Sequence, residues 1–152
     1  MQTHWLTRKG GSSCILFFAG WGMDPAPFTV AVSHRHDLLM IYDYRVLTEP
    51  DLTDLAASYQ NLHLVAWSMG VWVAARLLAQ SRTIFTTTVA LNGTLDPIDD
   101  RLGIAEKTFD AMIDSFTAEA LEAFYAAMFD NPKEAEQFMR NRPRRLREGL
   151  LE

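Results

Sequence analysis

The stretch Asn61-Leu-His-Leu-Val-Ala-Trp-Ser-Met-Gly-Val-Trp-Val-Ala-Ala-Arg-Leu-Leu78 decides how this chain folds. Its first part, residues 62–67, is a short apolar run that is typical of a buried strand. Its second part, residues 69–78, repeats apolar residues at helical spacing and predicts a helix. Because Ser68 alone separates them, the backbone must turn sharply there. A strand, a serine and a helix, with small residues two positions before and after the serine, are typical of a nucleophile elbow.

The turn at Ser68 suits the chemistry of acyl transfer. A serine hydroxyl is a weak nucleophile and must be presented to a base, and a sharp turn pushes it out of the backbone. The same turn aims the amide of Met69 at the place where negative charge develops on an attacked carbonyl. The first small residue is Ala66, where glycine is usual, and the second is Gly70. The alternative is an ordinary strand-to-helix turn that contains a serine.

Composition indicates a globular protein. A chain of 152 residues, 49% hydrophobic and 22% charged, predicts one domain with a sizeable core. The single cysteine, Cys14, excludes an internal disulfide, fits a reducing compartment and is expected in the core. The apolar run at residues 14–19 is too short for a signal peptide or a membrane span, so we expect a cytoplasmic protein without membrane contact.

Charge is unevenly distributed along the chain. The net charge is −5, with 8 basic and 15 acidic residues in 1–132 but 6 basic and 4 acidic residues in 133–152. An acidic body argues against nucleic acid as a partner. The basic cluster near the end, at residues 140–147, can still attract an acidic partner.

The first 96 residues alternate between strand and helix patterns, which predicts a mostly parallel sheet with crossover helices. Residues 2–8 predict an edge strand, and the turn signal Lys9-Gly10-Gly11 predicts a hairpin into the next strand. The other predicted strands are 15–18, 37–42, 62–67 and 86–91, and the predicted helices are 50–59 and 69–80.

A glycine-rich loop, Ala19-Gly20-Trp21-Gly22, follows the strand at 15–18. Acyl-transfer serines need a second amide donor, supplied by a loop after an earlier strand. Glycines on both sides of Trp21 would let its amide approach the substrate. Taken alone the loop fits a plain turn, but together with the Ser68 turn it predicts an oxyanion hole made by Trp21 and Met69.

Residues 97–152 change character and predict successive short helices. These are expected at 105–116, 117–129, 132–141 and 143–151. Thr117 and Asn131-Pro132 supply helix starts. We expect one domain in two parts, a sheet core at 1–96 and a helical cap at 97–152. Phe124 and Met128 would then line an acyl pocket, although a helical flank packed on the sheet explains the same apolar residues.

Four blocks of the sequence resemble one family. They are Phe17-Phe-Ala-Gly-Trp-Gly-Met-Asp24, Tyr42-Asp-Tyr-Arg45, His63-Leu-Val-Ala-Trp-Ser-Met-Gly-Val-Trp72, and Leu91-Asn-Gly-Thr94 with Pro97-Ile-Asp-Asp100. In this order they resemble the BioG-type pimeloyl-[acyl-carrier protein] methyl ester esterases, which are α/β-hydrolases of biotin synthesis. The resemblance implies release of methanol from a carrier-bound ester, with Ser68 as nucleophile, Trp21 and Met69 as oxyanion donors, and no cofactor or metal.

The chain departs from such enzymes in one respect, because no histidine follows Ser68. His63 lies roughly 16 Å from the serine, at about 3.3 Å per strand residue. His34 and His36 precede a parallel strand, at the wrong end of the sheet, and His4 is near an edge. We therefore expect the catalytic histidine, the acid and the last strands of the fold to be missing, so that this chain is inactive, exposes an apolar sheet edge and associates.

The remaining charged candidates are two aspartates and the arginine cluster. Asp96 is the one acid at a position that some hydrolases use, but aspartate before proline is also a common turn residue. Asp43 is interpreted as structural. Acyl-carrier proteins are acidic, so the arginine cluster is predicted to bind such a carrier at the rim of the helical segment; a solvated helix face is the alternative. The arginines of this cluster with the predicted docking role are Arg140, Arg142, Arg144 and Arg145.

The sequence is therefore consistent with three functions. The preferred one is hydrolysis of the pimeloyl-carrier methyl ester. A carboxylesterase acting on another short acyl ester is the first alternative. The second is a hydrolase-like module that binds an acyl carrier without catalysis.

Overall fold

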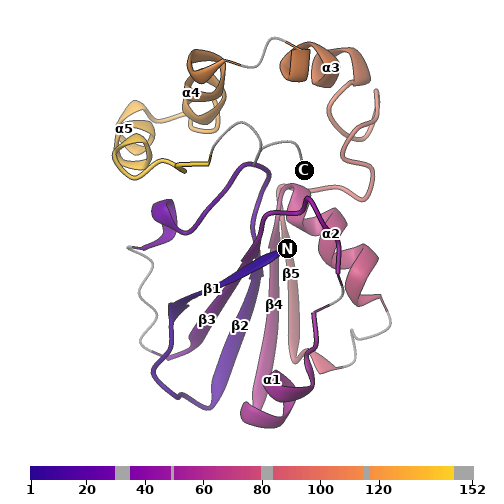
Figure 1. The fold of residues 1–152 in the computed structure, drawn as a ribbon, viewed down its shortest axis with the longest axis vertical. Helices are drawn as coiled ribbons and strands as arrows, with labels where there is room; N and C mark the ends of the chain where they lie inside the picture. Colours follow the sequence, from indigo (N-terminus) through magenta and orange to yellow (C-terminus); the bar gives the residue numbers. More distant parts are fainter. Residues whose placement is uncertain (30–34, 49, 80–83, 115–116, 146–152) are drawn as a thin grey trace.

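The computed structural model describes residues 1–29, 35–48, 50–79, 84–114 and 117–145. Within these residues the chain forms five strands, five α-helices and one short 3-10 helix, arranged as Figure 1 shows. The strands are β1 (Gln2–Thr7), β2 (Ser13–Phe18), β3 (Asp37–Tyr42), β4 (Asn61–Trp67) and β5 (Thr87–Leu91). The helices are η1 (Ala26–Phe28), α1 (Thr53–Ser58), α2 (Met69–Leu78), α3 (Glu106–Asp114), α4 (Ala118–Ala126) and α5 (Pro132–Arg140).

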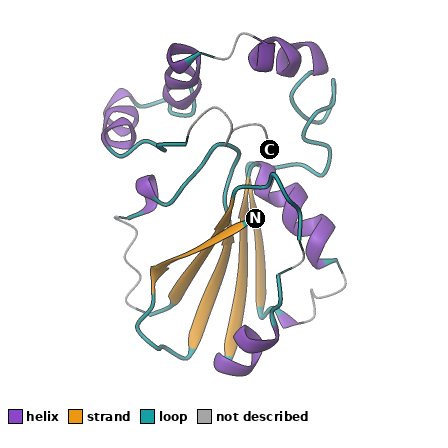
Figure 2. Ribbon diagram, in the orientation of Figure 1, coloured by secondary structure: helices purple, strands orange, loops and turns teal. Residues whose placement is uncertain are grey.

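The strands form one sheet in the order β1-β3-β2-β4-β5. All neighbours are parallel except β1, which runs antiparallel to β3. Helices and strands occupy separate layers, with α1 and α2 beside the sheet and α3, α4 and α5 beyond one end of it (Figure 2). The prediction of a mostly parallel sheet with crossover helices is confirmed for the described residues.

The predicted N-terminal hairpin is wrong, because β1 pairs with β3 and not with β2. Both edges of β2 are taken by the parallel strands β3 and β4. The connection from β1 to β2 is bound at the start of β3, where the buried carboxylate of Asp37 accepts hydrogen bonds from the amides of Lys9 and Gly10, at 2.7 and 3.1 Å. These bonds hold the connection at the start of β3, the strand with which β1 pairs.

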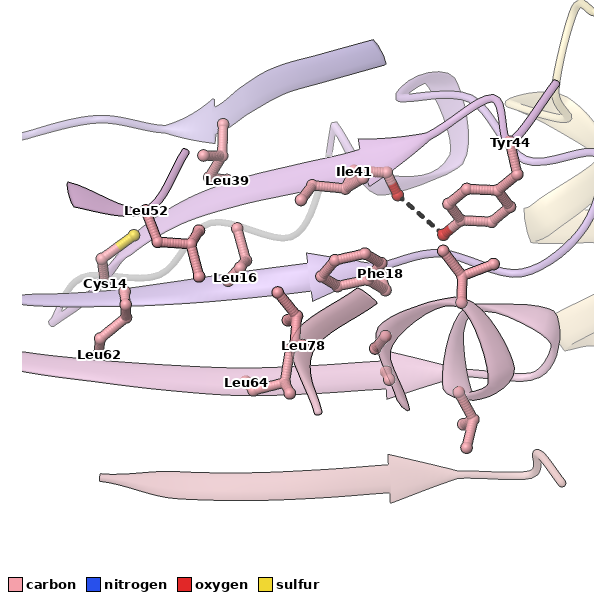
Figure 3. Packing of buried hydrophobic residues seen from close by; sticks show 14 residues of the cluster. Cys14, Leu16, Phe18, Leu39, Ile41, Tyr44, Leu52, Leu62, Leu64 and Leu78 are labelled. Atoms are coloured by element: carbon pink, nitrogen blue, oxygen red, sulfur yellow. Dashed lines mark hydrogen bonds between the residues drawn. The ribbon is translucent and has the colours of Figure 1, made fainter. Parts of the chain in front are cut away.

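The main core lies between the sheet and the helices α1 and α2. Alternate residues of β2, β3 and β4 point to this face, as the two-residue period of a strand requires. Figure 3 shows Leu16, Phe18 and Ile41 packed together with Leu64 and Leu78. A second cluster contains Met40 and Tyr125, so α4 packs on the sheet through its own buried ring.

The helices of the second half begin close to where their signals predict. The hydroxyl of Thr117 accepts a hydrogen bond from the Ala120 amide at 3.1 Å and caps α4. The side chain of Asn131 accepts one from the Lys133 amide and caps α5, with Pro132 in its first turn. The helix predicted at 143–151 is not observed at residues 143–145, and the rest of it lies outside the described residues.

The far edge of the sheet is β5, whose five residues are all exposed in the described structure. Its side chains include Val89 and Leu91, which are 38% and 46% exposed. An exposed strand edge with apolar side chains can pair with another chain. The predicted tendency to associate has this structural basis and stays a prediction.

Asp37 should make the stability of the fold depend on acid. Burial acts to raise its pKa, but hydrogen bonds from the Lys9 and Gly10 amides and the Tyr59 hydroxyl outweigh burial and hold the pKa below its usual value. Such a carboxylate stabilises the fold above its unfolded pKa and loses that contribution as the pH falls through its folded pKa.

We expect Asp37→Asn to lower the free energy of unfolding at pH 7 by about 1–3 kcal/mol. The difference from the parent protein should narrow below about pH 4. Denaturant unfolding at pH 7 and pH 3 measures both quantities, with Asp110→Asn, an exposed carboxylate on α3, as control. An equal loss at both pH values would contradict this account.

Candidate active site

Ser68 occupies the turn between β4 and α2 in a strained backbone conformation. Its φ is 54° and its ψ is −127°, a region that residues other than glycine rarely adopt. Such a conformation costs on the order of 1–3 kcal/mol and persists only where the surroundings impose it. The Ser68 amide donates to the carbonyl of Leu91 at 2.9 Å, which holds the turn against the end of β5. The side chain is half-buried, as expected for a presented hydroxyl.

Two glycines let neighbouring backbones approach this turn. A Cβ on Gly70 would lie 2.4 Å from the carbonyl oxygen of Phe18 and 2.5 Å from that of Ala19, so α2 packs directly on the end of β2. A Cβ on Gly93 would lie 2.5 Å from the carbonyl oxygen of Ser68. The loops after β2 and β5 can therefore reach the serine because both glycines lack a side chain.

The glycine-rich loop lies beside the serine, as predicted. A Cβ on Gly20 would come 3.3 Å from the Cβ of Ser68. Gly22 has a φ of 71°, which favours glycine, and the amide of Met23 closes the turn by donating to the carbonyl of Gly20 at 3.3 Å. This geometry brings Trp21 to the same pocket as Ser68 and Met69.

The pocket has a volume of about 470 Å³ and is mostly apolar. Its described lining contains no Asp, Glu, Lys, Arg or His side chain. The lining residues come from the two loops, from α2 and from the helical segment: Trp21, Ser68, Met69, Asn92, Gly93, Thr94, Pro97, Ile98, Leu102, Gly103, Ile104, Phe109, Met112 and Phe124. Such a cavity suits an uncharged, largely apolar ligand.

One wall of the pocket is a compact loop at residues 96–104, which the sequence interpretation missed. Ile98 and Ile104 form an isolated bridge, and the amide of Ile104 donates to the carbonyl of Pro97 at 2.9 Å. The carboxylate of Asp99 accepts from the amides of Arg101 and Leu102, both at 2.8 Å. Isoleucine and leucine spaced between aspartates are the signal that could have indicated this wall.

The two candidate acids do not line the pocket. Asp96 is exposed, and its amide donates to the hydroxyl of Thr94 in a local turn. Asp43 is buried after β3 and accepts from Gln2 and Arg45, in keeping with its structural interpretation. The Arg45 hydrogen bond, aided by the charge of Arg145, lowers the pKa of Asp43 to about 2.

The predicted acyl-pocket residues separate into two places. Phe124 lines the pocket and packs edge-on against Trp21, with ring centroids 5.5 Å apart. Met128 is not part of the described lining and packs in the second core cluster with Tyr125. Within the described structure, Phe124 lies at the pocket and Met128 does not, and a role of Phe124 in binding an acyl chain stays a prediction.

The arginine cluster also divides. Arg140 and Arg142 are exposed and pair with Glu136 and Glu122, at 2.8 and 3.0 Å. The exposed Arg144 donates its amide to the carboxylate of Asp24 at 2.6 Å.

The predicted docking role at the rim of the helical segment is wrong for Arg145. Its side chain is 7% exposed and pairs with buried Asp43 at 3.1 Å. The negative charge of Asp43 draws this arginine inward, so its guanidinium is not available at the rim.

The described residues bring no group of three His, Cys, Asp or Glu side chains together that could hold a metal ion. His63 lies on β4 before the serine and packs against His36, with ring centroids 5.5 Å apart. His34 lies outside the described residues. Across the same described ranges, no helix is both long and apolar enough to cross a bilayer.

The strained serine, the adjoining glycine loop and the apolar pocket are what the predicted family requires. A family described as "Pimeloyl-ACP methyl esterase BioG" matches residues 1–148. The chain belongs to the BioG family. A crystal structure of BioG from Haemophilus influenzae has the same fold, with a TM-score of 0.83 and 33% identity over 99% of this chain and 67% of that one.

This chain also matches part of each of two longer curated relatives. A malonyl-[acyl-carrier protein] O-methyltransferase from Bacteroides fragilis is 38% identical over 138 residues, or 91% of this chain. An uncharacterized protein from Haemophilus influenzae is 44% identical over 108 residues, or 70% of this chain. The match spans 28% and 48% of these relatives' lengths, respectively.

A more distant structure supports the fold alone. It comes from a study of carboxylesterases of Nitrososphaera gargenis and superposes with a TM-score of 0.65 at 13% identity, covering 98% of this chain and 65% of that one. Together with the BioG structure, it supports an α/β-hydrolase fold for the mostly parallel sheet and its helices. The role of residues 97–152 of this BioG-family chain as a cap stays a prediction.

Gly70 should be intolerant of a side chain. We expect Gly70→Ala to lower the free energy of unfolding by about 1–3 kcal/mol or more, because the new methyl group would clash with two backbone carbonyls. Gly11→Ala is a matched control, since its Cβ would meet its nearest neighbour at 3.6 Å. Denaturant unfolding compares the two variants, and unchanged stability of Gly70→Ala would refute the close packing of α2 on β2.

Arg145 should contribute more to stability than its exposed neighbours. We expect Arg145→Met to cost about 1–3 kcal/mol, less than the full loss of a buried pair because Arg45 still binds Asp43. Arg140→Met, which removes an exposed pair, should cost at most about 0.5 kcal/mol. Thermal and denaturant unfolding test this difference, which must be absent if Arg145 is a surface residue.

Proposed function

We propose that this chain carries the nucleophile and the oxyanion-binding loop of a serine esterase. Its substrate would be the methyl ester of a pimeloyl group attached to acyl-carrier protein, cleaved to the free acid and methanol during biotin synthesis. Membership of the BioG family supports the substrate. The observation that carries the proposal is the strained Ser68 turn, which shares an uncharged pocket with Trp21 and Met69.

In the proposed reaction, Ser68 Oγ attacks the ester carbonyl and loses its proton to a base. The amides of Trp21 and Met69 stabilise the oxyanion of the tetrahedral intermediate. Collapse of this intermediate breaks the bond to the methoxy oxygen, which leaves as methanol after taking up the proton. Water then hydrolyses the acyl-serine ester, releasing the carboxylate and restoring the hydroxyl.

The described residues leave the proton acceptor unassigned, because no histidine is among those that line the pocket. A serine without a base reacts slowly. We therefore infer that this chain alone has little activity and that an external base can raise it. A carrier-binding module without catalysis is the second candidate, and the same observation favours it.

The proposed partner is an acyl-carrier protein, and the relative named as a malonyl-[acyl-carrier protein] O-methyltransferase supports this. Arg140, Arg142 and Arg144 are exposed and offer positive charge to an acidic carrier. No nucleic-acid or membrane partner is proposed. A cytoplasmic location fits biotin synthesis and stays a prediction.

Hydrolysis assays can test the proposal. We expect this chain to hydrolyse pimeloyl-carrier methyl ester slowly, and imidazole, added as an external base, to raise the rate. Hydrolysis of this substrate should be faster than hydrolysis of simple aryl esters. Ser68→Ala should abolish both the basal and the imidazole-dependent reaction. With imidazole present, mass spectrometry after treatment with a fluorophosphonate should locate the label on Ser68, whereas little labelling is expected without an added base.

The possible outcomes separate the candidate functions. Equal rates with aryl esters would favour a general short-acyl carboxylesterase. Carrier binding without any Ser68-dependent hydrolysis, with or without imidazole, would favour the non-catalytic module. Circular dichroism of the parent protein and of Ser68→Ala tests that each is folded.

A further inference from the structure

Two tyrosine hydroxyls hold the glycine-rich loop at residues 19–22 from different elements. The Tyr44 hydroxyl donates to the carbonyl of Ala19 at 2.7 Å and also lies 3.1 Å from the carbonyl of Ile41, as Figure 3 shows for the second contact. The Tyr125 hydroxyl, from α4, donates to the carbonyl of Gly22 at 3.1 Å. Both tyrosines are buried, at 3% and 1% exposed.

These two contacts lie on either side of Trp21. One fixes the peptide that precedes Gly20, and the other fixes the peptide that follows Gly22. A glycine-rich turn has few conformational limits of its own, so contacts at its two ends restrict how the two peptides between them are oriented. The first of these peptides carries the Trp21 amide.

The residue next to Tyr125 extends the same contact. Phe124 packs edge-on against the Trp21 ring and also lines the pocket. Consecutive residues of α4 therefore touch consecutive residues of the loop, 103 positions away along the chain for Tyr125 and Gly22. The helix that helps to line the pocket is thus bonded directly to the loop.

The Tyr125 hydroxyl forms this contact in a dry environment. Its ring packs against Phe124 and Phe138, with centroids 5.8 Å away in both cases. A phenol could be replaced by phenylalanine for packing alone. The hydroxyl adds a hydrogen bond to the Gly22 carbonyl that phenylalanine would lack.

We propose that Tyr125 is a positioning residue that orients the Trp21 amide toward the oxyanion. It does not touch the reacting atoms and acts through the Gly22 carbonyl. This inference rests on the proposed esterase function, because the orientation of the amide matters for catalysis only if Ser68 attacks a carbonyl. It assigns to α4 a role in setting reactivity, besides lining the pocket.

The test compares Tyr125→Phe with Tyr59→Phe. Each substitution removes one hydroxyl hydrogen bond and keeps its ring, but the Tyr59 hydroxyl binds Asp37 at the start of β3, away from the loop. Similar losses in melting temperature are expected for both variants. Only Tyr125→Phe should shift the amide proton and nitrogen resonances of Trp21, Gly22 and Met23.

The second readout is the rate at which a fluorophosphonate labels Ser68, measured with imidazole present. We expect Tyr125→Phe to lower the maximal labelling rate about tenfold, which is a smaller effect than removal of a whole oxyanion donor. The fluorophosphonate concentration that gives half of the maximal rate should change little. Tyr59→Phe should label at the parent rate.

Two outcomes would overturn the inference in different ways. If the parent and Tyr125→Phe are labelled equally fast, or if the loop resonances do not move, Tyr125 does not position the amide and the esterase proposal is unaffected. If the folded parent protein is not labelled at all, the esterase proposal fails, and this inference fails with it.

Discussion

The strained backbone at Ser68 is the constraint on which the rest of the structure depends. A residue with a positive φ at this turn is held only because other parts of the chain meet it there. The end of β5 accepts the Ser68 amide, and Gly70 lies against the carbonyls at the end of β2. These contacts offset the local strain, and they also place two loops around the serine hydroxyl. Stability and the geometry of the site therefore come from the same packing.

Most strands and helix starts could be predicted because their signals are local. The apolar run before Ser68, the helical spacing after it and the caps at Thr117 and Asn131 each act within a few residues, and the structure confirms them. The partner of β1 could not be predicted in this way. The β1 pairing is accompanied by a contact between distant parts of the chain, in which the Asp37 carboxylate binds the connection after β1 from 28 residues away. A turn signal at Gly10-Gly11 indicates a turn and does not say which strand lies beside it.

The site was predictable to a similar extent. The serine turn and the Trp21 loop have recognisable patterns, and the structure brings them to one pocket. The burial of Arg145 was missed because the sequence shows an arginine cluster but not the distant Asp43 that binds one member. The tyrosine contacts with the loop were missed for the same reason, since single hydroxyls that bond to distant carbonyls leave no periodic pattern. The isoleucines of residues 96–104 lie in a loop, where no periodic pattern indicates that they line the pocket.

The uncharged lining of the pocket also bears on the end of the proposed reaction. An ester would enter this cavity as a neutral group, but its cleavage would create a carboxylate in a mostly apolar cavity whose described lining has no Lys, Arg or His side chain to pair with it. Transfer of that carboxylate to water is then favourable, whereas the reverse transfer is costly. Cleavage itself would weaken retention of the product, so in the proposed reaction the same cavity would accept the ester and disfavour the acid.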